Sequence, residues 1–166
     1  WEGGFGKRIL GENWVNHQTV KDVRELYLYT ENHITSSEFK VYEKTPVYLG
    51  DYIINTKVYI DENFGIRKVS YDESENGKFL LTIYYDSNQI IRFAYAYTVT
   101  YSTSDYDKDE ISEYRIYYDN SGKLVWKAQS EDGNYIALGE KVDIKFFEQI
   151  LNECPYEIFH QLNNSN

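Results

Sequence analysis

The segment RIYYDNSGKLVWKA, residues 115–128, joins two adjacent tyrosines to an aspartate and a short polar turn. A near copy, TIYYDSNQIIRFA, spans residues 82–94, and a looser one, KVYIDENFGIRKV, spans residues 57–69. Asn and Gly tolerate the positive φ angles of hairpin turns, and short connections make neighbouring strands antiparallel. The repeat therefore predicts β-hairpins in which one tyrosine packs in the core and its neighbour shields the outer surface. The aspartate is expected to accept hydrogen bonds from backbone N–H groups of the turn.

The same period-two pattern extends on both sides of the repeats. Stretches rich in Val, Ile, Tyr, Phe and Thr alternate with short separators that carry Asn or Gly. They predict a meander of about six strands, at residues 53–61, 66–72, 79–86, 90–102, 111–119 and 124–130.

Two helices are expected to cover this sheet. Apolar residues at steps of three and four predict the first helix from about residue 20 to 34, with Thr19 and Asp22 at the spacing of a capping box. Asp143 is placed to cap the second helix, and Val142 to pack against Phe147. Pro155 interrupts that helix, and further turns are expected through Ile158, Phe159 and Leu162.

Alternation along the longest strand suggests how the layers pack. Large side chains from Ile91 to Tyr101 fall on one face, whereas Ala94, Ala96 and Thr98 fall on the other. We therefore expect an α+β fold with one antiparallel meander sheet, one face of which is covered by both the N-terminal and the C-terminal helix. Residues 1–18 are expected to form an irregular lead-in, and residues 19–166 a single domain.

Composition narrows the function classes. The 166 residues include 27 Asp and Glu against 17 Lys and Arg, a formal charge of −10 that repels phosphate backbones and argues against nucleic acid as a partner. No apolar run is long enough to span a bilayer, and the single Cys154 allows neither an internal disulfide nor a zinc-type ligand spacing. The chain starts at Trp1 and contains no Met, so we expect that its natural start is missing and that any signal peptide would be missing with it.

No motif indicates catalysis or a cofactor. His17, His33 and His160 are scattered, and Cys154 lies beside Glu153, which disfavours a thiolate, so it is interpreted as an inert buried thiol. The GGFG stretch lacks the Lys-Ser/Thr of a phosphate loop, and GxSxG does not occur. We therefore predict a protein that is not an enzyme and needs no cofactor.

The densest group of carboxylates contains Asp105, Asp107 and Asp109. Alternating aspartates resemble the start of a calcium loop, but the sixth position is Glu110 rather than Gly, which excludes an EF-hand. A calcium site of another kind at the three aspartates is kept as an alternative to a solvated loop.

Tyrosine gives the chain its one feature suited to binding, with 18 copies. Aromatic rows on a one-sided sheet are more typical of a core, yet exposed rings can stack on sugars or anchor protein interfaces. The candidate binding residues are Tyr84 and Tyr118 in the repeats and Trp126 in the last predicted strand.

The helical VKDVRELY and the paired IYYD-turn-LV segments resemble a group of uncharacterised secreted or lipid-anchored envelope proteins of Bacteroides-like bacteria. The resemblance covers roughly residues 19–130 and implies export to the periplasm or cell surface. In this chain SNQ replaces the Asn-Gly turn of the second hairpin, and no lipid-anchor cysteine is present in the sequence. The resemblance implies no catalytic residues.

Two functions fit these observations. The first is a non-enzymatic exported domain that binds a protein or a glycan of the cell envelope. The alternative is an inhibitor or immunity-type protein whose acidic surface neutralises a basic toxin or hydrolase. A small hydrolase is disfavoured because no nucleophile or metal set is evident.

Overall fold

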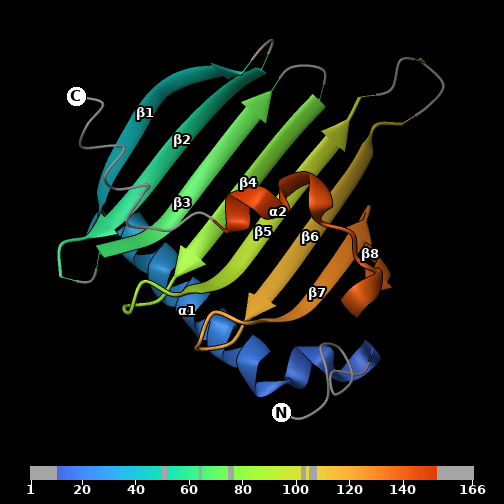
Figure 1. The fold of residues 1–166 in the computed structure, drawn as a ribbon, viewed down its shortest axis with the longest axis horizontal. Helices are drawn as coiled ribbons and strands as arrows, with labels where there is room; N and C mark the ends of the chain where they lie inside the picture. The colour runs from blue at the N-terminus through green and yellow to red at the C-terminus, as the bar shows by residue number, and fades with distance from the viewer. Residues whose placement is uncertain are drawn as a thin grey trace.

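The computed structural model describes residues 11–49, 52–63, 65–74, 77–101, 104 and 108–152. Its centre is one antiparallel sheet of eight strands, in which every strand pairs with its neighbours in sequence (Figure 1). The strands are β1 Lys40–Leu49, β2 Tyr52–Asp61, β3 Gly65–Ser74, β4 Gly77–Tyr85, β5 Ile91–Thr100, β6 Glu110–Tyr118, β7 Leu124–Glu131 and β8 Asn134–Leu138.

The two α-helices lie on opposite faces of this sheet. Helix α1, Gln18–Thr35, runs along one face, and the short helix α2, Lys145–Leu151, lies against the other (Figure 1). We call these the α1 face and the α2 face. Two 3-10 helices complete the fold, η1 at Gly11–Asn16 and η2 at Gly139–Lys141.

The expected α+β sandwich of six strands is therefore wrong in two respects. The fold is mainly β, with eight strands, and its helices are minor and do not share one face. The additional strands are the two edges, β1 and β8. Strand β1 contains Pro46, which is tolerated because β1 is an edge strand and its register shifts between Lys44 and Val47.

Both faces carry a buried cluster of apolar side chains. On the α2 face, Phe147 and Leu151 pack with Val69, Ile83 and Ile116 of the strands. On the α1 face the cluster consists of Trp14, Val20, Val23, Tyr84, Phe93, Tyr117, Val125, Trp126 and Ala128. A sheet covered on both faces needs no wet side, which explains why the one-sided prediction failed.

The repeated tyrosines contribute side chains to both buried clusters. Tyr84 and Tyr117 lie on the α1 face, whereas Tyr85 and Tyr118 lie on the α2 face, and all four are buried. The prediction that adjacent tyrosines lie on opposite sides is confirmed, but neither member is an outer shield. In each hairpin the register shifts at this position, as at a β-bulge, so that an extra residue enters the opposite strand.

That shift also separates two residues expected on one face of β5. Ile91 packs on the α2 face, whereas Phe93 packs on the α1 face. The expectation that the small residues face solvent is wrong as well, because Ala94 and Ala96 are fully buried on the α2 face. Phe93 is buried, as expected, while Tyr95 is half-buried.

Helix α1 confirms the helix predicted from residue 20 to 34 and extends it slightly at both ends. Its cap differs from the prediction, since the Nδ1 atom of His17 accepts a hydrogen bond from the Thr19 N–H at 3.2 Å. At α2, Asp143 accepts a bond from the Lys145 N–H at 3.0 Å. Trp14, from the predicted lead-in, docks on the α1 face, whereas Trp1 lies outside the described residues.

The turn aspartates bond backbone N–H groups as predicted. One carboxylate oxygen of Asp119 accepts from the Ser121 N–H at 2.9 Å, the Ser121 hydroxyl at 2.6 Å and the Lys123 N–H at 3.0 Å. The equivalent oxygen of Asp61 accepts from the Asn63 N–H at 2.9 Å. Burial opposes ionisation of Asp119, but the hydrogen bonds from Ser121 and Lys123 outweigh it and lower the pKa of this carboxyl.

We expect Asp119→Ala to lower the free energy of unfolding by about 1–2 kcal/mol, because it removes an acceptor shared by three donors. Asp61→Ala is the matched comparison and is expected to cost less, which chemical denaturation of both variants measures. Since the folded pKa of Asp119 is lowered, the difference between wild type and Asp119→Ala is present above the unfolded pKa and shrinks as pH falls through the folded pKa. Equal losses in the two variants would contradict the prediction.

Candidate functional site

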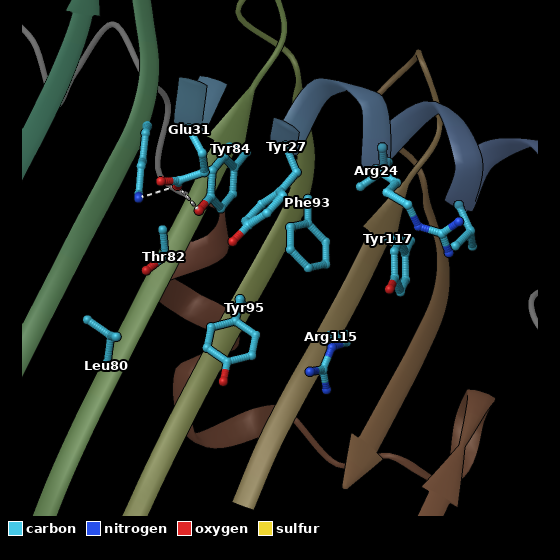
Figure 2. Close-up of a pocket in the computed structure, with 13 residues that line it drawn as sticks. Arg24, Tyr27, Glu31, Leu80, Thr82, Tyr84, Phe93, Tyr95, Arg115 and Tyr117 are labelled. Atoms are coloured by element: carbon cyan, nitrogen blue, oxygen red, sulfur yellow. Dashed lines mark hydrogen bonds and ion pairs between the residues drawn. The ribbon is translucent and has the colours of Figure 1, made fainter. Parts of the chain in front are cut away.

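A cleft lies between helix α1 and the sheet, with a volume of about 580 Å³ (Figure 2). Its lining comes from α1 and from the four strands β3 to β6. We call it the α1 cleft. Figure 2 shows α1 crossing one end of these strands, so that the floor continues beyond the helix past Leu80, Thr82 and Tyr95.

Strand register brings the floor residues together. Thr82, Tyr95 and Arg115 are cross-strand partners on β4, β5 and β6. Two residues further along each strand, a second row of partners is formed by Tyr84, Phe93 and Tyr117. Because alternate residues of a strand share a face, both rows face α1.

Helical spacing supplies the opposite wall. Arg24, Tyr27 and Glu31 are three and four residues apart and therefore share one side of α1, which is the side that lines the cleft. The Tyr27 ring packs on Tyr84, with 5.3 Å between ring centroids, and on Phe93, with 6.4 Å. The side chain of Tyr27 remains 40% exposed, so its ring is accessible from the cleft mouth.

One end of the cleft is closed by a charged cluster. The Glu31 carboxylate lies 2.5 Å from Lys68 Nζ and accepts a hydrogen bond from the Tyr84 hydroxyl at 2.6 Å. Burial, followed by the hydrogen bond to Glu31, raises the pKa of Tyr84. The phenol therefore stays protonated at neutral pH and acts as a donor, and the charges of Glu31 and Lys68 balance each other.

A second charged cluster lies toward the open end. Glu113 accepts a hydrogen bond from the Tyr95 hydroxyl at 2.5 Å and from Arg115 Nη2 at 3.2 Å. The Arg115 guanidinium carbon also lies 5.4 Å from the centroid of the Tyr95 ring, a cation–π distance. Two contacts thus fix the Arg115 side chain in the cleft.

Tyr117 lies between Arg115 and Arg24 in Figure 2. Burial raises the pKa of Tyr117 to about 12, while the charges of Arg115 and Arg24 act in the opposite direction. Both guanidiniums therefore interact electrostatically with the same phenol, that of Tyr117. Arg24 is exposed and forms no ion pair with any residue that the structure describes.

The residues predicted to bind do not gather in one place. Tyr84 lines the α1 cleft with only 3% of its surface exposed. Trp126 is buried on the same face, where its ring lies so near Gly139 that a Cβ atom there would approach it to 3.0 Å. Tyr118 is buried on the α2 face. Sequence reasoning did not identify Arg24, Tyr27 or Arg115 as site residues.

The calcium hypothesis gains no support from the described residues. Asp105 and Asp107 lie outside them, and Asp109 is exposed. Within the described ranges, no group of three or more His, Cys, Asp or Glu side chains is placed to hold a metal ion. Cys154, His160 and Pro155 also lie outside the described residues.

His17 caps α1, and His33 contacts Glu38 through Nε2 at 3.1 Å. Neither histidine lines the α1 cleft. No helix within the described part of the chain combines the length and apolar character needed to cross a membrane. Comparisons with protein-family models, with curated proteins and with solved structures find no match.

Proposed function

We propose that this protein is a non-enzymatic binding domain of the cell envelope and that it takes a glycan in the α1 cleft. The observation that carries the proposal is a concave site that joins accessible aromatic rings to hydrogen-bonding groups held in place. Its volume of about 580 Å³ is within the usual range of pockets for small ligands, ~300–1,000 Å³.

The arrangement of the rings favours a sugar. Tyr95 lies on the cleft floor with its hydroxyl tied to Glu113, so the orientation of its ring is fixed before a ligand arrives. Tyr27 reaches the same space from α1. Apolar faces of sugar rings pack against aromatic rings, while Thr82 and the arginines offer hydrogen-bonding partners for hydroxyl groups.

A whole protein fits this site less well. Stable protein interfaces bury ~800 Å² on each partner over a broad surface, whereas the α1 cleft is a concave space of about 580 Å³ that a helix partly covers. An acidic inhibitor of a basic partner would require carboxylates that face outward. At the cleft, Glu31 and Glu113 are instead bonded to Lys68, Tyr84, Tyr95 and Arg115. Export rests on the resemblance of the hairpin repeats to envelope proteins.

We expect Tyr95→Ala to weaken glycan binding at least about tenfold, or ~1.4 kcal/mol, because it removes the ring from the cleft floor. Binding is measured on a glycan array and then by titration calorimetry with the tightest glycan. Tyr95→Phe keeps the ring and is expected to retain most of the affinity. Tyr101→Ala is the matched control, since Tyr101 is 49% exposed and does not line the cleft.

Thermal unfolding of each variant separates loss of the site from loss of the fold. The proposal is contradicted if no glycan on the array binds, or if Tyr95→Ala binds as tightly as the wild type. Binding of peptides but of no glycan would likewise overturn the assignment of the ligand class.

A further inference from the structure

We infer that the glycan bound in the α1 cleft carries a carboxylate, which lies between Arg24 of α1 and Arg115 of β6. This inference rests on the proposed function and adds the chemical class of the ligand. It depends on the position and pairing of the two arginines.

The Arg115 side chain is held in a position in which its guanidinium can bind an anion. Its ion pair with Glu113 engages Nη2 at 3.2 Å, and its guanidinium carbon lies 5.4 Å from the centroid of the Tyr95 ring. A guanidinium presents five N–H donors in a fixed fork, and the bond to Glu113 engages one terminal nitrogen. The remaining donors are available to a ligand oxygen above the cleft floor.

Arg24 supplies the charge that is not neutralised. The cleft and its immediate partners contain three cations, Arg24, Lys68 and Arg115, and two carboxylates, Glu31 and Glu113. Lys68 pairs with Glu31 and Arg115 with Glu113, which leaves the exposed Arg24 as the excess positive charge. A local excess of +1 contrasts with the formal charge of −10 for the whole chain.

The sign and size of this excess charge indicate which class of ligand the cleft fits. A carboxylate brings one negative charge, which Arg24 balances, and its two oxygens match the fork of a guanidinium in a bidentate pair. A phosphate dianion would bring a second negative charge close to Glu113, where like charges repel. Uronic and sialic acids are therefore the sugars that this end of the cleft fits best.

The two arginines also lie at the correct place relative to the rings. Arg115 is adjacent to Tyr95, and Arg24 approaches Tyr117 from the helix (Figure 2). A sugar ring packed on Tyr95 would therefore place a carboxylate substituent near both guanidiniums. Because Arg24 is exposed, such a contact is screened by salt.

The test compares acidic glycans with their neutral methyl esters. The probes are trisaccharides of galacturonic acid, hyaluronan oligosaccharides and sialyllactose, each measured by calorimetry as the free acid and as the ester. We expect at least one acid to bind about tenfold tighter than its ester at low salt, with a difference that shrinks as ionic strength rises. Arg24→Gln is expected to remove most of this difference, because it weakens binding of the acid more than binding of the ester.

Lys21→Gln is the matched control, because it removes the same charge from an exposed position of α1 outside the cleft. Retention of the acid preference in Arg24→Gln, or its equal loss in Lys21→Gln, would overturn the inference. If every acid and its ester bind equally well to the wild type, the carboxylate assignment fails and the glycan-binding function stands. If no glycan of either kind binds, the proposed function fails and the inference fails with it.

Discussion

Above about pH 10 we expect the protein to lose stability steeply and to unfold with ionisation of its buried tyrosines. Burial raises the pKa of Tyr117 from 10.0 to about 12. Burial also raises the pKa of Tyr118, while burial and hydrogen bonds to glutamates raise the pKa values of Tyr84 and Tyr95. Tyrosine groups on both faces of the sheet therefore oppose ionisation in the folded state.

The direction in which stability changes with pH follows from the linkage between protonation and folding. A group whose folded pKa lies above its unfolded pKa contributes stability that is fully present below the unfolded value. For Tyr117 this contribution is lost as pH rises from 10.0 to about 12. The free energy of unfolding then falls by up to about 1.4 kcal/mol per pH unit for each such group. By about pH 12 the combined loss from the buried Tyr84, Tyr117 and Tyr118 is expected to be comparable with the whole stability of an average domain, about 5–15 kcal/mol.

Over a pH series, circular dichroism measures unfolding of the sheet and tyrosinate absorbance measures ionisation of the tyrosines. We expect the part of the absorbance change that comes from the buried phenols to coincide with the loss of circular dichroism, because these phenols ionise only when the sheet opens. Tyr117→Phe removes one group and is expected to lose stability less steeply above pH 10, whereas Tyr101→Phe, at an exposed position, is expected to follow the wild type. Gradual ionisation of all tyrosines in a protein that stays folded would contradict this prediction.

The sequence predicts the centre of this fold better than its edges. Each inner strand carries period-two alternation and a turn with Asn or Gly, and these local features locate the strands from β2 to β7 within a few residues. Edge strands are harder to predict, because their sequence patterns are less regular than those of central strands. Strand β1 contains Pro46, which a central strand would exclude, and β8 is only five residues long.

A clear signal for β8 was nevertheless present. Asp132 and Gly133 have φ angles of 49° and 86°, the positive values that a two-residue hairpin turn requires. An Asp-Gly pair between two alternating segments is a strong hairpin signal, so EDGNYIAL could have been assigned as a turn and a strand. The second helix itself was predicted, but its place on the opposite face was not, because alternation identifies two faces and does not say what covers each one.

The α1 cleft was predicted only in part, because it depends on tertiary contacts. Tyr84 was named, but its partner Glu31 is 53 residues earlier in the chain, on a helix whose position on the sheet no local pattern specifies. Arg115 lies in the hairpin repeat at residues 115–128, yet its place in the cleft follows only from cross-strand pairing with Tyr95. The rows of aromatic residues were visible in the sequence, whereas the cations above them required the fold.

Phe147→Ala is expected to destabilise the protein by about 3–5 kcal/mol, which is a large share of the stability of a typical domain. Phe147 is 1% exposed, and its ring centroid lies 5.6 Å from that of Tyr114 and 6.1 Å from that of Phe79. Helix α2 has seven residues, too few to be stable alone. Its position on the sheet therefore depends on this ring and on Leu151, which belongs to the same cluster.

The neighbouring Phe146→Ala is the matched control, since it deletes the same side chain from the same helix. Phe146 is 59% exposed, and its ring contacts with Phe79, Tyr114 and Phe147 are edge contacts, so we expect a loss below about 1.5 kcal/mol. Urea denaturation compares the two variants, and an unchanged m-value would show that the loss lies in the folded state. If the α2 face is buried, Phe147→Ala should lower the free energy of unfolding much more than Phe146→Ala does. Equal losses would mean that α2 does not seal the α2 face and that Ala94 and Ala96 owe their burial to other parts of the chain.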